Sequence, residues 1–266
     1  MSKLDQAISE LHTIDELSKQ DRWVNRIHPS VKLFLTLFFI ILTVSFGKYE
    51  LTGLLGLCIY PLFLFVVGDL QFGAAFRRVG VVLPFVGLVG IFNPIFDRQP
   101  VLSIGALVIS GGVLSFLGLV LKALLTVLSA YILIATTPIE QICASLRGFH
   151  VPKSIVITVL LIYRYLTVLL KEARRVTQAY ALRAPGQRGV QYRAWGPLLG
   201  QLLLRSMDRA ERIYAGMQLR GYDGNFLFAS AGKLRAADIL YGILLCAAFL
   251  LCRYVDLSAL IGSLFV

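Results

Sequence analysis

Residues 154–184, SIVITVLLIYRYLTVLLKEARRVTQAYALRA, begin almost apolar enough to cross a membrane and end as a strongly basic helix. If 154–170 spanned the bilayer, Arg164 would lie mid-span, where an arginine costs about 2.5–3.5 kcal/mol on insertion scales. Such a span would also carry residues 171–235, which hold twelve of the 26 lysines and arginines, to the outer face. Basic residues are retained on the cytoplasmic side. We therefore predict that 154–170 lies at, or dips into, the inner membrane interface.

The chain as a whole has the composition of a membrane protein. Of its 266 residues, 57% are hydrophobic and 15% are charged, and the mean hydropathy is +0.76. Soluble domains carry roughly 25% charged residues. The net charge of +11 does not indicate nucleic acid, because long apolar runs interrupt the sequence and retention of cytoplasmic loops explains the basic residues. The polar first thirty residues show no cleavable signal peptide.

Hydrophobicity and turn residues predict five membrane spans, at about 31–46, 51–68, 79–96, 113–136 and 237–252. A short extended segment is expected at 101–112. Basic residues gather before the first span and after the second, so we expect a cytoplasmic N-terminus. The predicted fold is an all-α integral membrane protein with about five transmembrane helices and a cytoplasmic pair of long amphipathic helices. Its predicted parts are 1–136 with an N-terminal amphipathic helix and four spans, 137–235 with the long helices, and 236–266 with the last span.

Two amphipathic helices are expected in the basic region, because apolar residues recur there every three or four positions. The first stripe consists of Ile162, Leu166, Leu169, Ala173, Val176 and Tyr180. The second consists of Leu199, Leu203, Met207, Ala210, Tyr214 and Met217. Outside lipid, these stripes can be buried only against each other or against another protein.

Each helix ends in a triplet with a central arginine. Leu182-Arg183-Ala184 precedes Pro185-Gly186, a stop signal, and Leu219-Arg220-Gly221 ends in a glycine suited to the left-handed terminal position. An arginine in a last turn complements the helix dipole by about 0.3–1 kcal/mol, which explains either triplet alone. Their recurrence in one basic region favours docking into acidic grooves through paired hydrogen bonds.

The arginine triplets resemble those of the transmembrane (T) component of energy-coupling factor transporters, ABC importers for vitamins and transition metals. Three further stretches agree: IHPSVK at 27–32, ATTP at 135–138, and 208–224, which looks most like the cobalt-importer component CbiQ. The family triplet is usually Ala-Arg-Gly. Here leucine replaces alanine in both copies, and alanine replaces glycine in the first, while the central arginine is kept.

The resemblance implies a non-catalytic coupling subunit for cobalt uptake in the bacterial inner membrane. Its implied partners are two cytoplasmic ABC ATPase subunits and a membrane substrate-binding (S) component that is CbiM-like, with a CbiN-like subunit as a further implied partner. The residues implied in ATPase coupling are Leu182, Arg183, Ala184, Leu219, Arg220 and Gly221. Those implied in contact with the S component are Ile162, Leu166, Leu169, Leu203, Met207 and Tyr214.

No phosphate-binding loop is visible, since Gly47-Lys48 and Gly232-Lys233 lack the rest of that motif. We therefore expect no cofactor in this chain and ATP-Mg on the partner subunits. Metal ligands are also scattered: His12, His28 and His150 are far apart in sequence, and Cys246 and Cys252 align poorly on one helix. No metal site is predicted, and another subunit would select the cargo.

Lys122 is a charged residue inside the fourth predicted span. It either faces the S component from the bundle or snorkels to the outer surface.

Three other functions stay open. One is the same role for nickel or a vitamin. Another is the permease half of a conventional ABC importer, which needs a substrate path within its own spans. The third is an intramembrane enzyme acting on lipid or isoprenoid, which needs clustered Asp, His or Ser in the spans.

Overall fold

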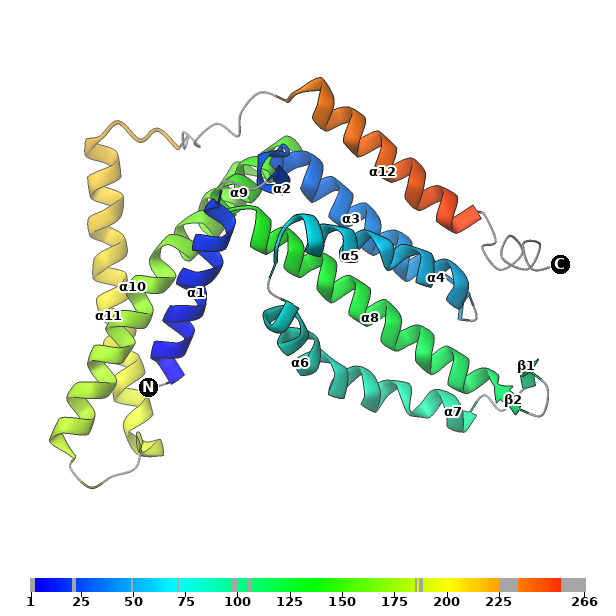
Figure 1. Ribbon diagram of the computed structural model, residues 1–266. Coiled ribbons are helices and arrows are strands. Elements are labelled where there is room, and N and C mark those ends of the chain that lie inside the picture. The colour runs from blue at the N-terminus through cyan, green and yellow to red at the C-terminus, as the bar shows by residue number, and fades with distance from the viewer. Residues whose placement is uncertain are drawn as a thin grey trace. The chain divides into compact units, whose positions relative to one another are not determined.

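The computed structural model describes residues 3–20, 23–48, 50–70, 72–96, 100–104, 107–184, 186, 189–224 and 234–254. Over these residues the chain is helical apart from one short hairpin, which confirms the all-α prediction (Figure 1). The chain divides into two compact units. Leu17–Pro138 and Ala231–Val266 form one, which we call the apolar unit, and Met1–Glu16 and Ile139–Ser230 form the other, the basic unit.

The apolar unit is built around α8 (Gly111–Thr136), a helix of 26 residues. Helices α3 (Pro29–Ser45), α4 (Leu51–Leu57), α5 (Ile59–Val67), α6 (Phe72–Gly90) and α7 (Phe92–Phe96) pack against it. Helix α12 (Ala236–Tyr254) packs on α3 and α4, and the short α2 (Trp23–Arg26) contacts α5. Strands β1 (Pro100–Ile104) and β2 (Leu107–Ser110) pair antiparallel before α8, in the region where an extended segment was expected.

Aromatic rings form the centre of this unit. Phe39, Tyr60 and Phe249 come from α3, α5 and α12, and their ring centroids lie 4.8 to 5.2 Å apart. Such tilted and edge-on contacts add to the stabilisation that burial gives. Outward-facing side chains of α3, α5 and α6 are also apolar, among them Ile41, Val66 and Phe85. An apolar core inside an apolar outer surface is typical of helices that contact lipid.

Four described helices are long and apolar enough to cross a bilayer: Gly73–Pro94, Gly111–Thr136, Lys153–Arg183 and Ala236–Arg253. Two shorter apolar helices cover Pro29–Ser45 and Leu51–Val67. Five of these six coincide with the predicted spans, which supports a multi-pass membrane protein. Lys153–Arg183 meets the same criterion by length and composition, and its placement at the interface stays a prediction.

Two predicted boundaries need correction. The second predicted span, 51–68, is two helices, because the α-helix is interrupted at Cys58 between α4 and α5. The third, 79–96, begins earlier, at Phe72, and continues through Pro84 to Gly90. A proline inside a long helix is tolerated where neighbouring helices support the chain, and here α8 packs along α6.

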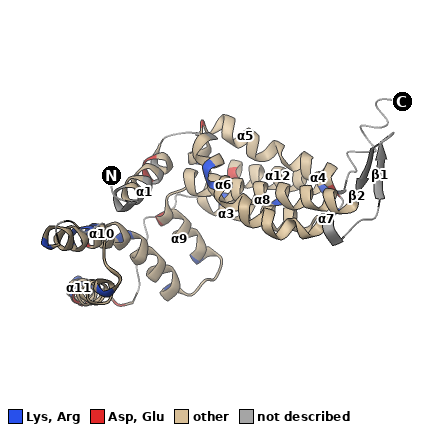
Figure 2. Ribbon diagram, turned by 90° about the horizontal axis from the view of Figure 1, so that it is seen from below, with Lys and Arg blue, Asp and Glu red and all other residues tan. Residues whose placement is uncertain are grey.

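The basic unit holds α1 (Lys3–Lys19, of which residues up to Glu16 belong to it), α9 (Ile139–Gly148), α10 (Lys153–Arg183) and α11 (Tyr192–Leu219). Helix α10 has 31 residues and lies between α1 and α11 (Figures 1 and 2). Cys143, Val156 and Leu160 form a small core between α9 and α10. The Tyr163 hydroxyl donates to Asp15 Oδ1 at 2.6 Å and so joins α10 to α1.

Candidate partner interface

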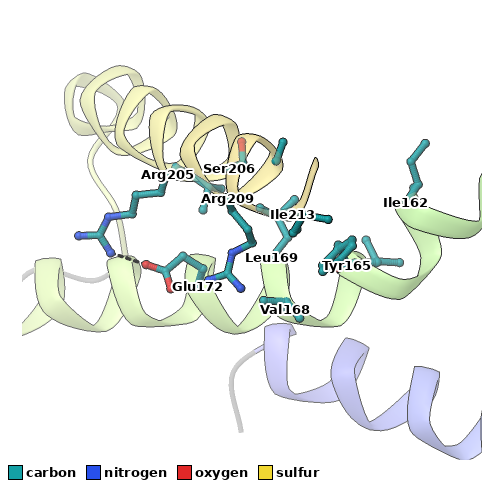
Figure 3. A pocket seen from close by; sticks show the side chains of 12 residues that line it. Ile162, Tyr165, Val168, Leu169, Glu172, Arg205, Ser206, Arg209 and Ile213 are labelled. Atoms are coloured by element: carbon teal, nitrogen blue, oxygen red, sulfur yellow. Dashed lines mark hydrogen bonds and ion pairs between the residues drawn. The ribbon is translucent and has the colours of Figure 1, made fainter. Parts of the chain in front are cut away.

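The two predicted amphipathic helices, α10 and α11, run in opposite directions and cross (Figure 1). Their facing side chains line a groove of about 240 Å³, with apolar walls from both helices (Figure 3). Glu172 on α10 accepts a hydrogen bond from Arg205 on α11, and Arg175 lies 3.8 Å from its other oxygen. Arginine recurs along both helices and lysine along α10, so the pair presents a basic surface (Figure 2).

The predicted stripe of α10 faces this groove. Ile162, Leu166 and Leu169 line it, together with Tyr165 and Val168. Further along α10, Val176 is buried. The periodicity therefore identified the face of α10 that meets α11.

The predicted stripe of α11 faces α10 only in part. Ala210 and Met217 line the space between the two helices, whereas Leu203, Met207 and Tyr214 are 60%, 54% and 55% exposed. Leu202, Ser206 and Ile213, which lie outside the stripe, also face α10. The side of α11 that packs on α10 is mixed, with Ser206 and Arg209 among the apolar residues, so the periodicity of apolar residues does not identify it. The helix pair consequently leaves an apolar row of α11 uncovered within the basic unit.

The first arginine triplet lies at the end of α10. Arg183 is the last helical residue, and the Ala184 amide donates to the Tyr180 carbonyl at 3.1 Å to close the final turn. Leu182 is 84% exposed. The described structure gives the Arg183 guanidinium no hydrogen bond or ion pair.

The second triplet ends α11 in a Schellman motif. Gly221 has φ +80°, and its amide donates to the Gln218 carbonyl at 2.9 Å. The Tyr222 amide donates to the Met217 carbonyl at 3.0 Å. These are the two hydrogen bonds of that motif, so the predicted left-handed glycine is confirmed. The preceding Leu219 is 90% exposed.

Sequence reasoning missed two residues that the fold places beside Arg220. Arg164 of α10 and Arg212 of α11 line one cavity of about 530 Å³ with it. In the sequence analysis Arg164 was a cost of membrane insertion, and Arg212 lay within the stretch 208–224 that resembles CbiQ. Antiparallel pairing brings them together, and no local pattern in the sequence encodes that pairing.

Lys122 lies in the apolar unit and is held by the chain's own backbone. Its Nζ donates to the Phe46 carbonyl at 2.5 Å, where α3 ends. A lysine at a helix C-terminus satisfies a carbonyl that has no partner in the helix. Contact of Lys122 with an S component stays a prediction.

His28, one of the histidines for which no metal was predicted, is the N-cap of α3. Its Nδ1 accepts a hydrogen bond from the Ser30 amide. Among the residues that the structure describes, no three His, Cys, Asp or Glu side chains are grouped to hold a metal ion.

A comparison with protein families decides the kind of protein. The family model of CbiQ, a cobalt transport protein, matches residues 20–229, which include α10, α11 and both arginine triplets. The chain belongs to the CbiQ family. Membership of the CbiQ family identifies it as a membrane transport component and agrees with its apolar helices.

Curated relatives carry names from the same group of CbiQ-like proteins. The nickel permease LarQ of Lactiplantibacillus plantarum is 29% identical over 120 residues, which are 45% of this chain and 44% of that protein. CbiQ of Rhodobacter capsulatus is 30% identical over 114 residues, 42% of this chain and 46% of the relative. EcfT of Staphylococcus aureus, an energy-coupling factor transporter transmembrane protein, is 27% identical over 129 residues, which are 46% of this chain and 47% of that protein. The match spans less than half the length of each relative.

Proposed function

We propose that this CbiQ-family chain is the coupling subunit of an ATP-driven energy-coupling factor importer. It transmits the motion of two cytoplasmic ATPase subunits to a separate substrate-binding component and carries out no chemistry itself. The observation that supports this function best is the pair of exposed Leu-Arg helix ends on one antiparallel helix pair. ATP-Mg is bound by the ATPase subunits.

The two arginine triplets are separated by most of the length of α10. Helix α11 ends beside Arg164, and the distance along α10 from Arg164 to Arg183 is on the order of 30 Å at 1.5 Å per residue. The two triplets therefore lie at opposite ends of the pair and suit one copy of a partner each. A planar guanidinium donates paired hydrogen bonds to a carboxylate, and the leucine beside it adds an apolar contact.

The uncovered apolar row of α11 suits the S component. Leu203, Met207 and Tyr214 are more than half exposed, and large apolar side chains gathered on one face mark a binding surface. Methionine and tyrosine are enriched in such surfaces. A relative from Methanocorpusculum labreanum is named as a putative fused cobalt transport protein CbiMQ. It is 31% identical over 97 residues, which are 36% of this chain and 16% of that protein. That name supports a CbiM-like partner, with which a CbiN-like subunit would assemble.

Cobalt is the proposed cargo, and nickel is the second candidate because one relative is named a nickel permease. The proposed location is a bacterial inner membrane with the N-terminus in the cytoplasm. Reconstitution of the chain with its S component and the ATPase pair tests the proposed ATP-driven transport and the proposed cargo. ATP-dependent accumulation of cobalt(II) in proteoliposomes is expected, and its absence for cobalt, nickel and vitamins alike would reject the function.

A further inference from the structure

Three arginines surround the cavity where α11 ends. Arg164 comes from α10, and Arg212 and Arg220 come from α11. Tyr165 and Tyr222 also line it, and none of its lining residues is acidic. The cavity of about 530 Å³ lies within the basic unit.

The local structure of α11 keeps this cavity open. Gly216 lies between Arg212 and Arg220 along the same side of the helix, and a Cβ added there would meet nothing within 4 Å. Arg212 and Arg220 are eight residues apart, about two turns, so both reach the same cavity. The Schellman motif at Gly221 fixes the chain beyond Arg220 and places Tyr222 at the cavity wall.

The three guanidinium groups have no counter-ion in the part of the chain that the structure describes. None of them donates a side-chain hydrogen bond or makes an ion pair there, whereas Arg205 on the same helix is paired with Glu172. Like charges held near one another repel, and an anion placed among them relieves that repulsion. Arginines bind carboxylates and phosphates with two parallel hydrogen bonds.

We infer that this three-arginine cavity receives acidic side chains of an ATPase subunit, so that Arg164 and Arg212 share the docking with Arg220. The inference rests on the proposed function and adds Arg164 and Arg212 to its docking residues. Leu219, 90% exposed, directly precedes Arg220 in the chain, and tyrosine and arginine near an exposed apolar side chain are typical of protein interfaces.

A lipid phosphate is the competing anionic occupant of the cavity, and the experiment below distinguishes it from an acidic protein side chain.

The test measures the affinity of the chain, assembled with its S component in nanodiscs, for the purified ATPase pair. Arg164→Gln and Arg212→Gln are each expected to raise the Kd about tenfold, the usual effect of losing one charge-assisted hydrogen-bonded contact. Arg164→Lys, which keeps the charge, should recover part of the loss. Lys171→Gln on α10 and Arg147→Gln on α9 remove exposed charges outside the cavity and should leave the Kd unchanged.

Two results would overturn the inference and leave the proposed function standing. In one, Arg220→Gln weakens binding while Arg164→Gln and Arg212→Gln do not. In the other, these two variants leave the ATPase affinity intact but reduce binding of the detergent-solubilised chain to vesicles of equal parts phosphatidylglycerol and phosphatidylcholine. Normal ATPase binding after joint replacement of Arg183 and Arg220 would instead reject the proposed function itself.

Discussion

The Lys32 ammonium group donates a hydrogen bond to the Thr136 carbonyl oxygen at 3.0 Å across 104 residues of sequence. Lys32 is 8% exposed, and Thr136 is the last residue of α8. The two residues belong to the stretches IHPSVK and ATTP, which the fold brings together. Two residues after Thr136, at Pro138, the chain leaves the apolar unit for the basic unit. Lys32 therefore holds α8 at the point where the chain passes between the units.

Replacing Lys32 with methionine is expected to destabilise the protein. The variant keeps the side chain's length but leaves the buried Thr136 carbonyl without its donor, which costs about 1–3 kcal/mol. Thermal unfolding in detergent measures the change. Lys48→Met, at an exposed turn position, is the matched control and should unfold like the parent protein. Equal unfolding temperatures for both variants would show that the hydrogen bond contributes nothing measurable.

Gly221→Ala should weaken the end of α11. At φ +80° an alanine Cβ is strained, so we expect a loss on the order of 1 kcal/mol in helix-end stability and weaker ATPase binding through Arg220. Unfolding temperature and ATPase Kd are the two measurements.

Gly200→Ala on the same helix is the control, for which the opposite change in stability is expected. Gly200 lies inside α11 with nothing within 4 Å of an added Cβ, so alanine should stabilise the helix by about 0.5–1 kcal/mol. If both substitutions shift the unfolding temperature in the same direction, the left-handed cap is not the cause.

The ends of the long helices were predictable from the sequence, and their packing was not. Pro185-Gly186 indicated the stop after Arg183, and Gly221 indicated a left-handed cap, because both signals are local. The face of α11 was predicted only in part, because the row that packs on α10 includes Ser206 and Arg209 as well as Leu202 and Ile213, and apolar periodicity does not identify a mixed row. Arg164 joined the candidate site only through antiparallel pairing, which depends on tertiary contacts between distant residues.

Cys143 should react slowly with maleimides. Its side chain is fully buried in the small core of α9 and α10, and burial, with a smaller contribution from Glu140, raises the pKa of the thiol. Reaction needs the thiolate and access, so labelling should proceed only as fast as this core opens. The measurement uses a variant whose other three cysteines are alanine. An exposed reference, Ala215→Cys, should react at the rate of a free thiol.

The raised thiol pKa of Cys143 also predicts the sign of a pH effect on stability. Because the thiol ionises at a lower pH in the unfolded chain than in the folded one, its contribution is intact below the ordinary value of 9.0 and is lost as pH rises above it. Relative to Cys143→Ala, the parent protein should therefore lose stability above about pH 9. Parallel stability curves for the two proteins would contradict this expectation.

Arg183 and Arg220 are predicted to dock one ATPase subunit each. Arg183→Gln and Arg220→Gln should each lower ATP-driven uptake about tenfold, since a charge-assisted contact is lost at one end of the helix pair. The double variant should abolish uptake and release the ATPase pair during purification, because no intact end then remains. Lysine at either position keeps the charge but not the paired donors and should restore only part of the activity. Lys171→Gln, an exposed charge between the two ends, should transport like the parent. Were the double variant to retain both complex and uptake, the helix ends would not be the coupling contacts.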